Sequence, residues 1–373
     1  MRIAQVANFI GPTSGGMKTA VHALAAGYRE HGHETLLVIP GPVDAYVDTA
    51  HGTVRSLRAP RVGGGYRLIV EPWRIIDALE DFAPTNVELS DKWSLVPVSR
   101  WARRRDVPAV LFSHERLDAM LSLRTGIQTG VATPVAALNR VLAGAVDSIV
   151  VTSDFAEKEF ARSAALAGTP LVKVPLGVDL ETFRPHPHQP SDLLRLVHLG
   201  RLSREKSPHL AVATAVALHR RGVPLRMDVY GDGPHRDELE ALADDAPVRF
   251  HGFVHDRARL ARQIATADVA LSVCPGETFG LAVLEALACG TPVVTADRGG
   301  ARELVDAASG AWGRPDPESL ADAVLRVAAR PVEVRRRAAR RRAEQFTWSR
   351  AVEAMLDLHG GLAHFGHGDP RSA

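Results

Sequence analysis

Cysteine is scarce in this sequence: only Cys274 and Cys289 occur among 373 residues. Two cysteines are too few for a disulfide framework, and no metal-ligand spacing surrounds either of them. No Asp-x-Asp metal motif follows a predicted strand. We therefore expect two reduced, buried thiols and no bound metal.

An excess of charge and long apolar runs are also missing. The chain has 45 Lys and Arg against 43 Asp and Glu, a balance that argues against nucleic acid as the main partner. No run of about 18 or more apolar residues is present to span a membrane. The first residues, MRIAQVANFI, lack the features of a signal peptide and are expected to form a strand. These absences predict a cytoplasmic enzyme.

Short apolar strands alternate with amphipathic helices along the chain, which is the pattern of parallel sheets covered on both faces. A chain of 373 residues usually exceeds one core, so two doubly wound α/β domains are expected. The proline-rich segment at residues 184–192 is predicted to link them. The predicted strands are residues 3–7, 35–39, 86–89, 109–113, 148–152, 194–199, 225–230, 248–251, 269–273 and 292–295.

The segment from Cys274 to Thr295 carries the most specific pattern. A Pro-Gly-Glu-Thr-Phe-Gly loop precedes an apolar helical run, which Gly290 ends before the next predicted strand. Unpaired N–H groups at the start of such a helix attract an anion, typically phosphate. Glu277 in the loop and Glu285 about one turn inside the helix could accept hydrogen bonds from sugar hydroxyls beside that anion. The alternative is an ordinary capped helix start with an exposed glutamate.

Four further motifs accompany this segment. GRLSREK at residues 200–206 places Arg201 and Lys206 at a strand end, where cations can bind a diphosphate by charge-assisted hydrogen bonds. YGDGPHRDELEAL at residues 230–242 is predicted to form a strand, a glycine-rich turn and a helix. HGFV at residues 251–254 is predicted to be an edge strand, and LGVDLETFRP at residues 176–185 closes the first half.

Together these motifs resemble those of the family 4 retaining glycosyltransferases, whose Glu-x7-Glu signature is matched by Glu277 and Glu285. The resemblance covers nearly the whole chain, is greatest to actinobacterial-type mannosyltransferases, and departs at Leu176, where the family usually has Asn. It implies a GT-B fold, in which two Rossmann-like domains face an interdomain cleft. The acceptor-binding domain would be residues 1–185 and the donor-binding domain residues 190–346. A C-terminal helix at residues 347–365 is expected to pack back on the first domain.

The resemblance also implies roles for individual residues. Arg201 and Lys206 would stabilise the departing diphosphate, while Glu277 and the backbone of the following loop would hold the donor sugar. Glu285 would bind the ribose. The implied catalytic residues are Arg201, Lys206, Glu277 and His114, and the implied donor-binding residues are Gly15, Gly16, Gly200, Val254, Phe279, Gly280, Leu281 and Glu285.

Two of these candidates come from the first half of the chain. Gly15 and Gly16 lie in GPTSGGMKT, which misses the phosphate-binding G-x4-G-K-[ST] pattern because Met17 separates Gly16 from Lys18. In the resembled family, a Gly-Gly pair at this turn approaches the donor phosphates and sugar. His114 follows a predicted strand, and open sheets bind ligands beyond the carboxyl ends of their strands. A purely structural role is the alternative for this histidine.

The expected reaction transfers a hexose from a nucleotide diphosphate sugar to a hydroxyl acceptor, with retention and without a cofactor or divalent metal. Overall likeness favours GDP-mannose as donor, with a glycolipid or another hydroxyl compound as acceptor. The alternative is a UDP-sugar, such as UDP-glucose or UDP-N-acetylglucosamine, with a small-molecule or polysaccharide acceptor. A non-catalytic sugar-nucleotide-binding protein would be expected to lack the cations, and a nicotinamide dehydrogenase would need a G-x-G-x-x-G turn. The sequence predicts no oligomeric state.

Two arginine-rich segments and a histidine-containing tail are expected at the surface. Residues 100–105 (RWARRR) and 335–342 (RRRAARRR) are predicted to be solvated helix faces. The first segment includes Trp101, so it is also compatible with peripheral contact with anionic lipid at the inner face of the membrane. His359, His364 and His367 are expected to be exposed or disordered.

Overall fold

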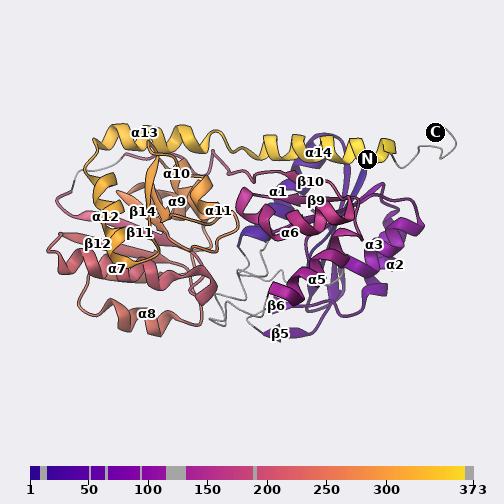
Figure 1. Cartoon of the computed structure of the whole chain (residues 1–373), viewed down its shortest axis with the longest axis horizontal. Helices are drawn as coiled ribbons and strands as arrows, with labels where there is room; N and C mark the ends of the chain where they lie inside the picture. Colours follow the sequence, from indigo (N-terminus) through magenta and orange to yellow (C-terminus); the bar gives the residue numbers. More distant parts are fainter. Residues whose placement is uncertain are drawn as a thin grey trace. The chain divides into compact units, whose positions relative to one another are not determined.

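A computed structural model describes residues 1–8, 15–49, 52–63, 66–92, 95–114, 132–187 and 191–365, and leaves out His367 and the side chain of His364. The described chain forms two compact units, and Figure 1 labels many of their helices and strands. Apart from the gaps just given, the first unit contains residues 1–114, 132–175 and 348–365, and the second contains residues 176–347.

The first unit is built on an eight-stranded sheet in the order β10-β9-β8-β7-β1-β2-β4-β3. Its strand pairs are parallel except for β3 with β4 at one edge. The strands are β1 (Arg2–Val6), β2 (Glu34–Gly41), β3 (Ala45–Thr49), β4 (Gly52–Arg58), β7 (Asn86–Leu89), β8 (Ala109–Ser113), β9 (Ser148–Val151) and β10 (Leu171–Lys173). A separate antiparallel pair is formed by β5 (Arg61–Gly63) and β6 (Tyr66–Arg67).

Helices pack on this sheet through an aliphatic core. The helices are α1 (Gly16–Glu30), α2 (Pro72–Phe82), α3 (Leu95–Arg104), α5 (Ala132–Ala143), α6 (Asp154–Ala167) and α14 (Trp348–Phe365). From α2, α3 and α6, the side chains of Leu79, Val98 and Phe160 join a buried cluster with Val87 and Leu111 of the sheet. The C-terminal helix α14 lies beside α1 in this unit.

The second unit is built on a six-stranded parallel sheet in the order β13-β12-β11-β14-β15-β16. Its strands are β11 (Leu194–Leu199), β12 (Leu225–Tyr230), β13 (Val248–Gly252), β14 (Val269–Ser272), β15 (Val293–Ala296) and β16 (Gly310–Gly313). Chain order reverses between the neighbouring strands β11 and β14. In open α/β sheets, ligands bind at the carboxyl ends of strands at such a reversal.

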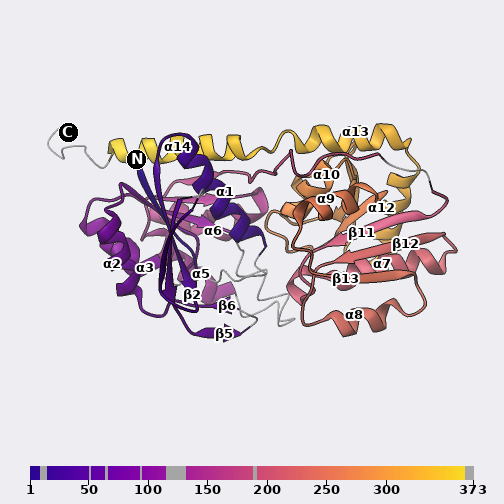
Figure 2. The same ribbon diagram turned by 180° about the vertical axis from the view of Figure 1, so that it is seen from behind.

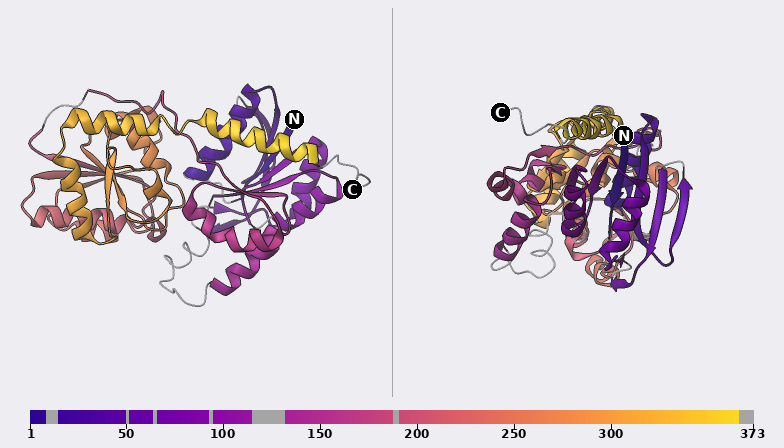
Figure 3. Two further views of the ribbon diagram at one scale, coloured as in Figure 1. Left: turned by 45° about the horizontal axis from the view of Figure 1, so that its top comes forward. Right: turned by 90° about the vertical axis from the view of Figure 1, so that its right-hand side faces the viewer.

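Helices lie on both faces of the second sheet, as Figure 3 shows. They are α7 (Pro208–Arg220), α8 (Arg236–Ala243), α9 (Arg257–Ala265), α10 (Leu281–Ala288), α11 (Gly300–Glu303), α12 (Pro317–Ala328) and α13 (Val332–Ala343), with a short 3-10 helix, η1 (Arg204–Lys206). One layer packs α7 with α8 and α12, and the other packs α10 with α9 and α13. Val212 and Val324 from the first layer join the buried cluster around Val229 and Leu271.

The second unit begins at Leu176, earlier than the sequence-based boundary. Val178 donates its N–H to the carbonyl of Phe346 at 3.1 Å. Arg340 of α13 donates to the carbonyl of the fully buried Phe183 at 2.9 Å. These contacts attach the LGVDLETFRP segment to the second unit before the proline-rich stretch begins.

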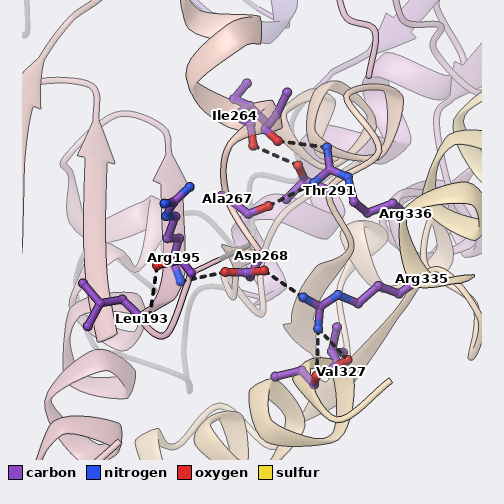
Figure 4. Close-up of polar contacts among 12 residues, drawn as sticks. Leu193, Arg195, Ile264, Ala267, Asp268, Thr291, Val327, Arg335 and Arg336 are labelled. Carbon is purple, nitrogen blue, oxygen red and sulfur yellow. Dashed lines mark hydrogen bonds and ion pairs between the residues drawn. The ribbon is translucent and has the colours of Figure 1, made fainter. Parts of the chain in front are cut away.

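The arginine-rich segment of α13 is not a solvated face, so that prediction is wrong for Arg335 and Arg336, which are buried (Figure 4). The Arg335 guanidinium lies 2.8 Å from Asp268 and donates to carbonyls at the end of α12. Arg336 donates to carbonyls at the ends of α9 and α10 and in the connection after α9. Helix ends present carbonyls without intrahelical partners, and a guanidinium can satisfy several at once. The arginines therefore join helix ends beneath the surface.

His359 in α14 is fully buried, which corrects the expectation of an exposed tail histidine. Its Nε2 lies 2.7 Å from Glu88 of β7, and Tyr28 and Gln5 donate to the same carboxylate at 2.5 and 2.8 Å. Burial opposes ionisation of Glu88, but His359 and these hydrogen bonds hold its pKa below the usual value. Burial and the neighbouring Glu88 raise the pKa of Tyr28 well above its usual value. This buried cluster attaches α14 to the first sheet.

The tryptophan-containing cluster on α3 is tied to the neighbouring helix α2. Trp101 donates its indole N–H to Glu80 at 3.1 Å, and Arg105 donates to the same carboxylate at 2.6 Å.

Within the described residues, no helix has both the length and the apolar content needed to cross a membrane.

Candidate functional site

The loop from Cys274 to Gly280 connects β14 to α10 and is held by its neighbours. Gly300 donates its N–H to the carbonyl of Glu277 at 2.6 Å, and the Cys274 thiol donates to the carbonyl of Glu205 at 3.1 Å. Gly280 has a φ of +102°, which L side chains rarely adopt, and it turns the chain into α10. The loop is therefore fixed between η1 and α11, with the first N–H groups of α10 at its end.

Lys206 and Glu277 form an ion pair at this loop. The Lys206 ammonium lies 3.0 and 2.8 Å from the two carboxylate oxygens of Glu277. The side chain of Lys206 is 43% exposed and that of Glu277 is 17% exposed, so the cation approaches the acid from the solvent side. Because η1 follows β11 and the loop follows β14, the pair lies where chain order reverses in the sheet. The fold thus brings together two of the predicted catalytic residues.

Gly200 and Arg201 form the turn between β11 and η1. This turn is pressed against the Gly-Asp-Gly turn that follows β12, since a Cβ on Gly231 would lie 1.9 Å from the carbonyl oxygen of Gly200. Likewise, a Cβ on Gly233 would lie 2.4 Å from the carbonyl oxygen of Leu202. Glycine is required at both positions for this close approach. The YGDG motif therefore supports the turn that carries the half-buried Arg201.

Glu285 lies inside α10 and forms an ion pair with Arg257, the first residue of α9. The Arg257 Nη2 lies 2.6 Å from Glu285 Oε1, and the side chain of Glu285 is only 13% exposed. Burial raises the pKa of Glu285, and the charge and hydrogen bond of Arg257 oppose that rise. The predicted site residues did not include Arg257. The sequence could have indicated Arg257, because it begins a helix shortly after the predicted site residue Val254.

Val254 lies in the loop after β13, which forms one edge of the second sheet (Figure 2). On the neighbouring strand, Tyr230 stacks on His251 with ring centroids 4.7 Å apart. His251 is held in turn by Asp228, whose carboxylate lies 2.8 Å from its Nε2. The loop that carries Val254 leads directly into α9 and therefore to Arg257 and Glu285.

His114 directly follows β8 in the first unit. Its ring stacks on Phe112 with centroids 4.5 Å apart, and its Nε2 lies 3.2 Å from the hydroxyl of Ser90. Burial lowers the pKa of His114 from 6.5 to about 4. The ring is therefore neutral at neutral pH, and it can exchange hydrogen bonds there but carries no positive charge.

Gly15 and Gly16 also belong to the first unit, at the start of the helix that follows β1. Gly15 is the N-cap of α1, Gly16 is its first residue, and both are exposed. A Cβ on Gly15 would meet nothing within 4 Å. This turn and His114 follow parallel strands, so both lie at the carboxyl edge of the first sheet.

Neither cysteine suits a chemical role in this site. Cys274 and Cys289 are buried free thiols, as predicted. Burial raises the pKa of the first to about 11 and that of the second to about 12, so both remain protonated at neutral pH. Over the part of the chain that the structure describes, no three His, Cys, Asp or Glu side chains gather as metal ligands. The positive charge around the site comes from Arg201, Lys206 and Arg257.

Two protein-family models match the chain. The model of glycosyl transferases group 1 matches residues 194–330, within the second unit. The model of the glycosyl transferase 4-like domain matches residues 15–177, which correspond closely to the first unit. Both matches support the resemblance to retaining glycosyltransferases that the motifs indicate.

Curated relatives match over most of the chain. A GDP-mannose-dependent alpha-(1-6)-phosphatidylinositol dimannoside mannosyltransferase of Mycobacterium tuberculosis is 42% identical over 375 residues, which cover 97% of each protein. A D-inositol 3-phosphate glycosyltransferase of Saccharomonospora viridis is 32% identical over 305 residues, which cover 75% of this chain and 69% of the relative.

Solved structures share the fold at lower sequence identity. Sucrose-phosphate synthase from Thermosynechococcus elongatus superposes with a TM-score of 0.79 at 21% identity, over 98% of this chain and 99% of that one. Anabaena HepE in complex with UDP and glucose superposes with a TM-score of 0.74 at 18% identity, over 96% and 99%. These structures confirm the predicted fold class of two Rossmann-like domains.

Proposed function

Because the chain belongs to the glycosyl transferases group 1 family and is a GT-B glycosyltransferase, we propose that it transfers mannose from GDP-mannose to a phosphatidylinositol mannoside, with retention at the anomeric carbon. The observation that carries this proposal is the 42% identity, over 97% of both proteins, to an enzyme named for this donor and this class of acceptor. The residues around the carboxyl edge of the second sheet suit such a donor.

We assign each part of the donor, from the base to the sugar, to residues of the second unit. The loop at Val254 contacts the base, and Glu285 accepts hydrogen bonds from the ribose hydroxyls. Arg201 and Lys206 bind the diphosphate. Glu277 and the backbone N–H groups at the start of α10 hold the mannose. The Arg257–Glu285 and Lys206–Glu277 ion pairs join neighbouring segments, which supports this assignment.

In the proposed reaction, the bond between mannose C1 and the diphosphate oxygen breaks while the acceptor hydroxyl attacks C1 from the same face. The acceptor proton passes to the departing phosphate oxygen, so no enzymic nucleophile is needed. Negative charge grows on the diphosphate, and Arg201 and Lys206 stabilise it more strongly than they stabilise the bound donor. Lys206 is paired with Glu277 and is also 43% exposed, so it can turn towards a bound phosphate. Glu277 then becomes available to accept hydrogen bonds from mannose hydroxyls.

Residues of the first unit are also proposed to take part in the reaction. His114 is neutral and can exchange hydrogen bonds with a mannose hydroxyl. The Gly15–Gly16 turn has no side chains and lets its backbone approach the donor. The acceptor is also assigned to this unit. A lipid-linked acceptor would bring the protein to a membrane surface.

A donor-by-acceptor matrix tests the proposal. The purified full chain would be incubated with GDP-mannose, UDP-glucose or UDP-N-acetylglucosamine and with vesicles containing phosphatidylinositol dimannoside, and products would be identified by mass spectrometry. We expect one added hexose with GDP-mannose alone, and the same yield with a metal chelator present. Transfer from a UDP-sugar, or acceptance of only soluble inositol phosphate, would contradict the assignment.

A further inference from the structure

We infer that Arg257 is a positioning residue for donor binding, which orients the Glu285 carboxylate towards the ribose hydroxyls of the nucleotide. This inference rests on the proposed function, in which Glu285 binds the ribose. Nothing in the resemblance or the comparisons assigns a role to Arg257. Its contacts in the described structure supply the argument.

The contact between the two side chains fixes the carboxylate on one side. Arg257 Nη2 donates to Glu285 Oε1 at 2.6 Å. A carboxylate has two oxygens that accept hydrogen bonds, so a contact at Oε1 is compatible with ribose hydroxyls binding at Oε2. Because the side chain of Glu285 is 13% exposed, it has little freedom to turn elsewhere.

Arg257 is itself held in place from two directions. It is the first residue of α9, whose N-cap Asp256 accepts the N–H of Arg259 at 2.9 Å. On the other side, its guanidinium lies over the ring of Phe183, 4.8 Å from the centroid, and Phe183 is fully buried. A planar guanidinium stacked on a ring is restrained more than a free side chain is. The arginine is therefore fixed before any ligand binds.

The exposure of Arg257 argues against a role in stability alone. Its side chain is 49% exposed, and solvent screening at such a side chain weakens the contribution of an ion pair to stability. The same half-exposed position is where a ligand can approach. The loop that leads to Arg257 carries Val254, which is assigned to the base. The ion pair therefore joins the start of α9, next to the proposed base subsite, to the helix that carries Glu285.

Among the described residues, Arg257 is the charged group that influences the pKa of Glu285. Burial raises the pKa of Glu285, and Arg257 is the cation that opposes this rise. Just after the end of α10, Cys289 remains a protonated thiol, and from α13 Arg336 and Arg340 donate to backbone carbonyls. Without Arg257, the carboxyl should take up a proton at a higher pH.

Asp179 is the other acid that Arg257 influences. Its carboxylate accepts the N–H groups of Glu181 and Thr182, both at 3.0 Å. Burial opposes its ionisation, but these hydrogen bonds, with a contribution from Arg257, lower its pKa. Asp179 is therefore occupied locally and does not replace Glu285 as the partner of Arg257.

The test compares GDP with 2′,3′-dideoxy-GDP by calorimetry in the full-length protein, in Arg257→Met, Arg257→Lys and Glu285→Gln variants, and in an Arg262→Met control. Arg262 lies on the same helix and is exposed. A charge-assisted hydrogen bond contributes about 1.5–3 kcal/mol, so the unaltered protein should prefer GDP by about 10-fold or more. Arg257→Met and Glu285→Gln should both lose most of this preference. Arg257→Lys should restore part of it, and Arg262→Met should keep it.

The pH dependence of GDP affinity gives a second measurement. A purely structural role of Arg257 would leave this dependence unchanged. In Arg257→Met, affinity for GDP should fall on mild acidification, because the Glu285 carboxyl then becomes protonated. The control should show a smaller fall. If Glu285→Gln loses the preference while Arg257→Met keeps it at every pH, the role of Arg257 is disproved and the ribose assignment stands. If Glu285→Gln itself keeps the preference, the ribose assignment fails, and the role of Arg257 fails with it.

Discussion

Lys206 and Glu277 are each other's partners in the described structure, yet the proposed reaction gives each of them a different partner. The ammonium must bind phosphate and the carboxylate must bind mannose hydroxyls. Because the side chain of Lys206 is 43% exposed, solvent screens the pair, so its two members can exchange partners at small cost. The residues that perform the chemistry are therefore expected to be poor determinants of stability.

Replacing Lys206 by Ala should separate catalysis from folding. Loss of one group that stabilises charge in the transition state often lowers turnover by about 100-fold or more. The melting temperature should stay near that of the unaltered protein, because the lysine side chain is 43% exposed. Arg204 lies in the same turn, is 62% exposed and forms an ion pair with the surface residue Glu238, so Arg204→Ala is a matched control. Equal turnover in the two variants would remove Lys206 from the mechanism.

His114 is expected to contribute a hydrogen bond and not a titrating charge. Burial lowers its pKa to about 4, so it stays neutral through the neutral range. Replacing it by Gln should lower kcat/KM but leave the shape of its pH profile between about pH 5 and about pH 8 unchanged. If the substitution instead abolished an ionisation in that interval, the histidine would act as an acid or a base.

At the scale of helices and strands, the central strands that lead to the candidate site were predictable from the sequence. The edge strand of the first sheet was not. The strands β7, β8, β11 and β12 have the predicted bounds, because a buried parallel strand is a short apolar run. The edge strand β3, AYVDT, is largely exposed and pairs antiparallel with β4, so neither apolar content nor alternation marks it. Pairing of this strand is decided by tertiary contacts.

Side chains that join distant segments were the other part that the sequence could not reveal. A run of arginines predicts a solvated face, yet Arg336 is buried because its donors meet carbonyls at the ends of two other helices. The sequence suggests that His359 belongs to a polar tail, but in the structure it is paired with Glu88 of β7. Arg257 illustrates the same limit in the candidate site. Its partners, Glu285 and Phe183, come from two other segments, whereas the Glu-x7-Glu motif is local and can be recognised directly.

The buried cluster that attaches α14 predicts how stability depends on pH. Replacing Glu88 by Gln would remove the partner of the buried His359, a change that usually costs about 3–5 kcal/mol at neutral pH. The pKa of Glu88 is lower in the folded state, so its contribution is present above the unfolded value of about 4.3 and is lost as pH falls through the folded value. Denaturant titrations should therefore show the two proteins converging in stability under acidic conditions.

A control for this effect is available on the surface of the same unit. Glu34 is 65% exposed and lies 3.6 Å from Arg2, so Glu34→Gln should change the free energy of unfolding by about 1 kcal/mol or less. If Glu88→Gln were no more destabilising than Glu34→Gln at neutral pH, the cluster would not be what anchors α14.

For the whole molecule, residues of both units are proposed to serve one reaction. The group 1 family model matches residues 194–330 in the unit with the proposed donor-binding residues, and the 4-like model matches residues 15–177 in the unit with His114 and the Gly15–Gly16 turn. The second-unit motifs were predictable because nucleotide recognition uses local glycine turns and strand ends. The acceptor could be assigned only with the help of a relative, since its contacts are not concentrated in a recognisable motif.

The Gly16→Val variant tests whether the first unit takes part in transfer. Gly16 is the first residue of α1 and is exposed, so valine can adopt its helical backbone, but the added bulk would obstruct the approach of the turn to the donor. GDP affinity should be retained because the nucleotide is assigned to the second unit, while mannose transfer should fail. Full turnover at an unchanged melting temperature would show that the turn lines no active site.

The most direct test of the central claim is the anomeric configuration of the product. The full chain would be supplied with GDP-mannose labelled with carbon-13 at C1 and with phosphatidylinositol dimannoside in vesicles, and the purified glycolipid would be examined by NMR. The account predicts one added mannose with the one-bond carbon–hydrogen coupling of an α-linkage, because the donor is also α. A β-linked mannose, or release of free mannose without any new glycolipid, would contradict it.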